Sequence, residues 1–214
     1  MTPRSSHLAE QFDDALQQRE ASTLGMWAFL ATEILFFGVL FAGYTVMRLL
    51  WGDAFAAASR HTDLWLGAVE TGILLVSSFT MVMAIRAVQL ARTRAALLLL
   101  LATALLGVAF LAVHGLEYVD DYHAGVIPGV RYDEPGVTGV HETLFFLLYY
   151  VTTLFHGLHV FIGVVLVTLM AVRVRRGAFS PGYYTPLEVV GLYWHLVDIV
   201  WIFVFPLYYQ VGRS

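Results

Sequence analysis

The sequence predicts an all-α integral membrane protein, a bundle of five transmembrane helices. Of its 214 residues 59% are hydrophobic and only 13% are charged, and its mean hydropathy is +0.73. Because roughly a quarter of the residues in a soluble domain are charged, this composition is typical of a chain in a bilayer. The apolar residues form five long unbroken runs, each able to cross a hydrocarbon core of about 30 Å as a helix. Transmembrane strands would instead show shorter alternating segments.

Taken in order, the chain begins with a polar segment and continues as one transmembrane domain. Residues 1–23 are mildly acidic and are expected to be cytoplasmic, with at most a short amphipathic surface helix. No secretory signal peptide is expected, because the first apolar run is long enough to be a full span. Residues 24–214 contain neither a repeat nor a low-complexity tract. The five spans are expected near residues 25–47, 64–85, 95–115, 144–172 and 189–209.

The distribution of arginine predicts the orientation in the membrane. All 12 basic residues are Arg, and with five spans eight of them fall on the side of the N-terminus and four on the other side. The positive-inside rule therefore places the N-terminus in the cytoplasm and the C-terminus outside, where the 116–140 loop is acidic. Aromatic residues at span ends are interpreted as an interfacial belt without a functional role: Trp51, Trp65, Tyr149, Tyr150, Tyr208 and Tyr209.

Composition excludes several classes of function. The absence of cysteine removes disulfides, thiolate metal sites, iron–sulfur clusters and covalently attached haem. The formal net charge of −4 offers no basic stripe for a phosphate backbone, so nucleic-acid binding is not expected.

Ionisable residues inside the spans fall into two predicted layers. A charged side chain in hydrocarbon costs several kcal/mol unless it is partnered, so these residues should face protein. Counted at about 1.5 Å per residue, one layer lies roughly 10–20 Å from the cytoplasmic side and the other lies near the external side. The inner layer contains Glu33, His156, His159, His195 and Asp198, and the outer layer contains Glu70, His114, Glu117, His141 and Glu142.

Three interpretations compete for the inner layer. His156 and His159, like His195 and Asp198, are three residues apart and share a helix face, which suits a metal site. A proton or ion path is the second interpretation. In the third, acid and imidazole groups satisfy one another between neighbouring helices. We adopt the third, with no metal and no catalytic residue on this chain. Glu33 is then either protonated, as a candidate proton antenna or a neutral structural acid, or paired with a histidine.

Four short motifs lie in order along nearly the whole chain. The last span carries Trp-His-x-x-Asp-x-x-Trp, the fourth His-Gly-x-His-Val and the first Thr-Glu-x-x-Phe-Phe, and the third closes with Glu-Tyr. In this the chain resembles subunit III of the haem–copper oxidases. The matching residues are Trp194, His195, Asp198 and Trp201, then His156, Gly157, His159 and Val160, then Thr32, Glu33, Phe36 and Phe37, and finally Glu117 and Tyr118.

The resemblance implies a non-catalytic subunit of an aerobic terminal oxidase of the cytochrome c oxidase type, in a bacterial cytoplasmic membrane. Such an enzyme reduces oxygen to water and pumps protons. In the family, subunit III stabilises subunit I, supports its proton-uptake side and binds phospholipid, while haem and copper belong to partner subunits. Glu33 corresponds to the family's intramembrane carboxylate, and the other inner-layer residues correspond to polar groups that hold the bundle together near it.

The chain departs from the longer family members, which have seven helices, because it corresponds to their last five. The family's lipid cleft lies between the first two helices and the rest, so a helix of another subunit would have to complete it. Short forms accompany quinol oxidases and nitric oxide reductases as well, and both remain alternatives. A free-standing metalloenzyme and a small transporter are alternatives from other classes. Five spans with three mid-membrane histidines leave too few ligands for two haems and a copper.

Overall fold

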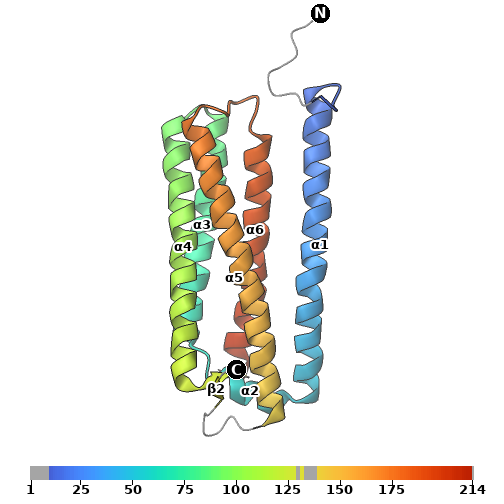
Figure 1. The fold of residues 1–214 in the computed structure, drawn as a ribbon, viewed down its shortest axis with the longest axis vertical. Coiled ribbons are helices and arrows are strands. Elements are labelled where there is room, and N and C mark those ends of the chain that lie inside the picture. The colour runs from blue at the N-terminus through green and yellow to red at the C-terminus, as the bar shows by residue number, and fades with distance from the viewer. Residues whose placement is uncertain (1–9, 129–130, 133–138, 214) are drawn as a thin grey trace, which may run out of the picture.

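Five long helices run roughly parallel in the computed structural model, which describes residues 10–128, 131–132 and 139–213 (Figure 1). All five are long and apolar enough to cross a membrane, which confirms the predicted all-α fold with five spans. Arg4, Asp133 and Glu134, which contributed to the predicted orientation, lie outside the described residues, as does the side chain of Arg131. The helices are α1 (Ala15–Leu50), α3 (Leu64–Gln89), α4 (Thr93–Ala124), α5 (Val140–Arg175) and α6 (Thr185–Phe205).

The helix ends depart from the predicted spans where polar residues begin or continue a helix. The Asp14 carboxylate accepts a hydrogen bond of 2.7 Å from the Gln17 backbone N–H, so α1 begins at Ala15. Residues 15–23 are thus the first turns of α1, and the expectation of at most a short surface helix there was wrong. Helix α4 continues to Ala124 and ends at Gly125 with φ of +74°. The predicted 116–140 loop is correspondingly shorter.

Short elements gather at the end of the bundle where the C-terminus lies (Figure 1). Helix α2 (Gly52–Ser59) follows α1, and the strands β1 (Val126–Ile127) and β2 (Arg131–Tyr132) form an antiparallel pair between α4 and α5. Pro206 has no N–H to donate, so α6 ends before it, earlier than the predicted residue 209. A π-helical turn, η1 (Pro206–Gln210), and a 3₁₀ turn, η2 (Val211–Arg213), complete the chain.

Helix α6 is the central element and α1 the peripheral one. Helices α3 and α4 form an antiparallel hairpin, α5 packs on α4, and α6 contacts α1, α3 and α5. In the most apolar stretch of each span, 56% of the residues are buried for the span Thr185–Arg213, which contains α6, but only 17% for α1. Figure 1 shows α1 standing at one side of the bundle.

Trp194 of α6 fixes the spacing of three helices. Its ring lies so close to Gly107 of α4 and Gly163 of α5 that an added Cβ would stand 2.6 Å and 2.8 Å from ring atoms. The indole N–H donates a hydrogen bond of 3.1 Å to the hydroxyl of Ser77 in α3. Glycine is therefore required by close approach at these two positions, as is common where membrane helices meet.

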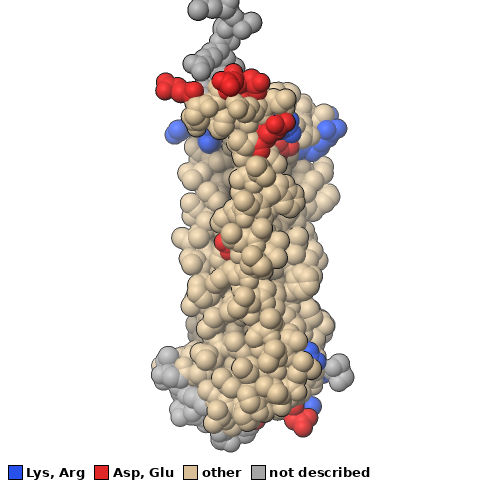
Figure 2. Space-filling model, turned by 90° about the vertical axis from the view of Figure 1, so that its right-hand side faces the viewer, with Lys and Arg blue, Asp and Glu red and all other residues tan. Residues whose placement is uncertain are grey.

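Charged residues are concentrated at the two ends of the molecule. Figure 2 shows a broad, almost uncharged band between them, as expected for a surface in contact with hydrocarbon. The described arginines at the end where α1 begins are Arg19, Arg86, Arg92, Arg94, Arg173, Arg175 and Arg176, and those at the other end with described side chains are Arg48, Arg60 and Arg213.

Candidate functional site

The inner polar group is centred on an acid–imidazole pair between α1 and α5. Glu33 Oε2 lies 3.0 Å from His159 Nε2, and the two side chains are 17% and 16% exposed. Phe36 and Phe37 of α1 pack against the His159 ring. The Tyr193 hydroxyl of α6 donates to the backbone carbonyl of His159 at 2.9 Å. Glu33 is thus paired, one of the two states expected for it.

The other nitrogen of His159 fixes where the shared proton lies. His159 Nδ1 is 2.6 Å from the backbone carbonyl of Phe155, which can only accept, so Nδ1 carries a hydrogen. A neutral ring then has no proton on Nε2. The bond to Glu33 therefore contains one proton, on the carboxyl group of a neutral pair or on the ring of an ion pair. The pair has no net charge in either arrangement, which suits its place in the membrane.

His195 and Asp198 do not pair with each other, although they share a face of α6. His195 Nδ1 lies 2.7 Å from the Ser78 hydroxyl of α3. Ser78 also faces the Asp198 carboxyl group. Both Asp198 oxygens are buried and have no hydrogen-bond partner of normal geometry within the described residues.

His156 is separate from His159 and lies one turn earlier on α5. Its ring is fully buried and contacts Phe110 of α4 and Trp201 of α6, with ring centres 5.4 Å and 5.0 Å away. Neither ring nitrogen has a hydrogen-bond partner among residues 10–128, 131–132 and 139–213. The expectation that all buried acid and imidazole groups satisfy one another was therefore wrong for His156 and Asp198. The position of each residue along its span predicts its depth in the membrane, but it does not predict which neighbouring helix the side chain faces.

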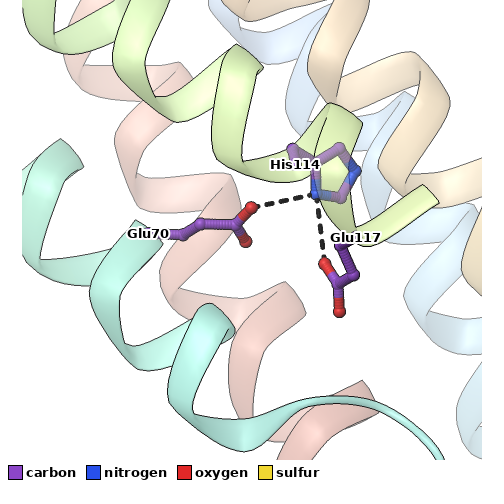
Figure 3. Close-up of side chains that lie close together, drawn as sticks. All are labelled: Glu70, His114 and Glu117. Carbon is purple, nitrogen blue, oxygen red and sulfur yellow. Dashed lines mark hydrogen bonds and ion pairs between the residues drawn. The ribbon is translucent and has the colours of Figure 1, made fainter. Parts of the chain in front are cut away.

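The outer polar group contains the Glu–His–Glu cluster, defined as Glu70, His114 and Glu117. His114 Nδ1 lies 3.2 Å from Glu70 Oε1 and 3.5 Å from Glu117 Oε2. Figure 3 shows both carboxylates turned toward this one ring nitrogen. Glu70 comes from α3, and the other two side chains lie one turn apart on α4. All three are buried.

Tyrosine hydroxyls lie around the Glu–His–Glu cluster and one of them donates to it. These contacts were not predicted from the sequence. Tyr209 donates to Glu117 Oε2 at 2.8 Å, and its oxygen is 3.0 Å from that of Tyr149. Tyr208 bonds the Thr152 hydroxyl at 3.0 Å. These three tyrosines are completely buried, so their assignment to an interfacial belt was wrong. For Tyr208 and Tyr209 the sequence signal is Pro206, which ends α6 and begins the turn that contains both.

His141 and Glu142 lie at the start of α5, apart from the cluster. The His141 ring stacks on Trp51, with ring centres 4.3 Å apart and planes at 14°. Glu142 is in the first helical turn and folds back over Gly139, where a carboxylate is favoured by the helix dipole. The predicted outer layer therefore separates into a buried cluster and a helix start.

The arrangement offers acid–base and metal-ligand groups. Within the described part of the chain, the Glu–His–Glu cluster is the one set of at least three ligand-type side chains whose donor atoms lie within 4.8 Å of one another. The inner-layer faces considered for a metal in the sequence analysis are not brought together in this way.

A cavity of about 610 Å³ opens between the start of α1 and the α5–α6 connection. Its lining combines the polar side chains of Arg19 and Ser22 with apolar ones such as Met170 and Val190. Arg19 also forms an ion pair of 3.3 Å with Glu188.

Comparison with protein families gives one match that covers almost the whole chain. Residues 11–213 match the family model described as cytochrome c oxidase subunit III.

Similar curated proteins come from bacteria. A probable quinol oxidase subunit 3 of Staphylococcus saprophyticus is 31% identical over 209 residues, 97% of each chain. A probable cytochrome c oxidase subunit 3 of Nocardia farcinica is 31% identical over 197 residues, 92% of this chain and 91% of the relative. A probable quinol oxidase subunit 3 of Staphylococcus aureus is 29% identical over 209 residues, 97% of each chain.

Proposed function

This chain belongs to the cytochrome c oxidase subunit III family, and from that premise we propose that it is a non-catalytic subunit of a proton-pumping terminal oxidase. It stabilises subunit I, which holds the haem and copper, and supports the side on which subunit I takes up protons. The complex is an integral membrane oxidoreductase of several subunits, in a bacterial cytoplasmic membrane.

The surroundings of the three mid-membrane histidines support the non-catalytic role. His159 is engaged by Glu33 and by a backbone carbonyl, and His195 by Ser78. His156 is enclosed by aromatic rings. An axial haem ligand needs a ring nitrogen that faces a cofactor-sized space, and these three rings point at different helix contacts.

The exposed apolar flanks support a role as a binding partner of subunit I. Membrane helices associate through close packing and through polar contacts, so a subunit interface and a lipid-facing surface have similar composition. Disulfide crosslinking tests the contact, because the chain has no cysteine of its own. Single cysteines placed along the exposed faces of α1 and α5, paired with cysteines in subunit I, should crosslink on one flank only. Absence of any crosslink when the same scan is extended to the exposed faces of α3, α4 and α6 would contradict the proposal.

The Glu33–His159 pair is the observation that carries the proposed proton function. It holds one exchangeable proton, is partly exposed, and follows an acidic N-terminal segment on the side proposed to be cytoplasmic. We expect Glu33→Gln to keep the subunit in the complex, because an amide still bonds to an imidazole. The variant oxidase should lose activity after fewer turnovers and show an altered pH dependence of turnover.

The matched control is Glu188→Gln, which removes an exposed carboxylate at the same end of the bundle. Unchanged turnover lifetime and pH dependence in Glu33→Gln would leave the pair with a packing role alone.

A phospholipid site is proposed at the cavity beside Arg19. A guanidinium next to apolar walls suits an anionic head group with its acyl chain along the helices. Mass spectrometry of the purified complex should find a retained phospholipid that is lost in Arg19→Gln but kept in Arg176→Gln.

The proposed orientation places the N-terminus in the cytoplasm. Seven described arginines lie at the end where α1 begins, against three with described side chains at the other end. A reporter fused after the C-terminus that is active only outside the cytoplasm should be active.

The electron donor is proposed to be set by the partner subunits. The curated relatives include both quinol and cytochrome c oxidase subunits at similar identity. Oxygen uptake by the purified complex with reduced cytochrome c and with a quinol identifies the donor.

A further inference from the structure

The structure contains a ligand set of three buried side chains from two helices. In the Glu–His–Glu cluster, Nδ1 of His114 stands 3.2 Å from Glu70 Oε1 and 3.5 Å from Glu117 Oε2. Tetrahedral ligands at the Zn–N and Zn–O distances of proteins stand about 3.4 Å from one another. The two separations from His114 Nδ1 therefore match a first coordination sphere, and all three donor atoms lie within 4.8 Å of one another.

Two carboxylate oxygens in this cluster are unpartnered although they are buried. Glu70 is 0% exposed and Glu117 is 3% exposed. Within the described residues, Glu70 Oε2 and Glu117 Oε1 accept no hydrogen bond. A buried carboxylate oxygen without a donor is costly, and a cation bound at the other oxygen of each carboxylate would offset that cost by neutralising the group.

The charges of the cluster do not balance by themselves. Two carboxylates and one imidazolium carry a net charge of −1 inside a spanning region, whereas two carboxylates, a neutral imidazole and a divalent cation carry none. Arg213, one of the three arginines with described side chains at this end, donates instead to the backbone carbonyls of Tyr209, Thr62 and Arg60.

The walls of the cluster hold the ligands in position. The ring of Phe110 stacks on that of His114 with centres 5.7 Å apart, and Trp201 meets the other side edge-on at 5.6 Å. The hydroxyl of Tyr209 donates to Glu117 Oε2 at 2.8 Å, which leaves the second lone pair of that oxygen for a metal. Such outer contacts orient ligands in metal sites.

We propose that the Glu–His–Glu cluster binds one divalent cation of the Zn²⁺ class. Glu70 Oε1, His114 Nδ1 and Glu117 Oε2, which face one another in Figure 3, supply one nitrogen and two oxygens. Nitrogen and oxygen donors in this number suit zinc, and the absence of thiolates disfavours soft metals. The ion joins α3 to α4 near the end that holds the C-terminus.

Zinc content of the chain, extracted from its membrane with its partner subunits, tests the proposal. After exposure to Zn²⁺ and removal of free metal, elemental analysis is scaled to the amount of this chain. We expect about one zinc per chain, with X-ray absorption at the zinc edge showing nitrogen and oxygen neighbours at about 2.0–2.1 Å. Glu70→Gln and Glu117→Gln should each lose that zinc, and the control Glu142→Gln should keep it.

Three outcomes would overturn the proposal. One is a wild-type chain that retains no zinc, a result that also decides the matter if the variants fail to assemble. Another is zinc retained equally in Glu70→Gln. The third is an infrared band of a protonated carboxyl group in the wild type that disappears in Glu70→Gln, which would show that a proton balances the charge. None of these outcomes depends on oxidase activity, so they do not bear on the proposed role of the subunit.

Discussion

Glu33 Oε2 lies 3.0 Å from His159 Nε2, and this contact joins α1 to α5 in the middle of the spanning region. Two further polar contacts tie the same helix to the bundle at its two ends. Arg19 pairs with Glu188 at the beginning of α6, and the Tyr44 hydroxyl donates to the carbonyl of Leu207. Helix α1, the most exposed of the five long helices, is therefore held to the bundle by polar contacts at three levels along its length.

Replacing Glu33 should separate the effect of its charge from that of its hydrogen bond. Glu33→Leu removes the partner of His159 Nε2 and should destabilise the protein by about 1 kcal/mol, as typical for a hydrogen bond between membrane helices. Glu33→Gln should cost less. Thermal unfolding followed by tryptophan fluorescence measures both. Thr45→Val is the control, because this exposed hydroxyl on α1 donates to the carbonyl of Phe41 in its own helix.

Two glycines on α5 should respond with opposite sign to the same substitution. A Cβ at Gly163 would lie 2.8 Å from the Trp194 ring, so Gly163→Ala should destabilise by about 1–3 kcal/mol. Gly157 has open space, and Gly157→Ala should be neutral or stabilise by up to about 1 kcal/mol through helix propensity. Thermal unfolding of the two variants checks this. Equal effects would show that Trp194 does not set the helix spacing.

Tyr209 should matter through its hydroxyl. Tyr209→Phe leaves Glu117 Oε2 and the Tyr149 hydroxyl with one partner fewer inside the bundle, at a cost of about 1–3 kcal/mol. The midpoint of thermal unfolding should fall accordingly. Tyr184→Phe, at the opposite end and next to Arg19, is the matched control and should have little effect.

Arg213 should hold the C-terminal turns in place. Its guanidinium donates to the carbonyls of Tyr209 and Thr62 at 2.7 Å and 2.5 Å. Arg213→Gln should therefore speed amide hydrogen exchange over residues 208–213 by about tenfold, the equivalent of about 1.4 kcal/mol of local opening. The same substitution at the exposed Arg176 should leave this exchange unchanged. If these amides remain protected from exchange in Arg213→Gln, the segment is held in place by the buried side chains of Tyr208 and Tyr209 and not by Arg213.

The five spans could be predicted because their signal is local and strong. Twenty apolar residues in a row identify a helix whatever surrounds it, but its ends depend on single polar contacts. Helix α1, capped by Asp14, begins at Ala15, ten residues before the predicted span at 25–47, and Pro206 ends α6 inside the predicted span at 189–209. Hydropathy averages over such residues, so the first helix was predicted too short and the last was placed four residues too far along the chain.

The sequence predicted how deep the polar side chains lie in the membrane, but it predicted their hydrogen-bond partners only in part. The spacing of His114 and Glu117 places them on one face of a helix, and the sequence alone gives that contact. The third member, Glu70, lies beside them because α3 and α4 form a hairpin in which the face of α3 that carries Glu70 packs against α4. By the same spacing His195 and Asp198 share a face of α6, yet Ser78 of α3, a residue with no distinguishing pattern, binds the histidine.

The three polar contacts of α1 restrict how this helix can move. Arg19, Glu33 and Tyr44 are spread along most of the helix, and each meets a partner at one height on the bundle. A piston-like slide of α1 by a single turn would shift it by about 5.4 Å and break all three contacts at once. Swinging outward from either end breaks them one at a time. If this helix ever moves during turnover, it should peel away from the bundle rather than glide along it.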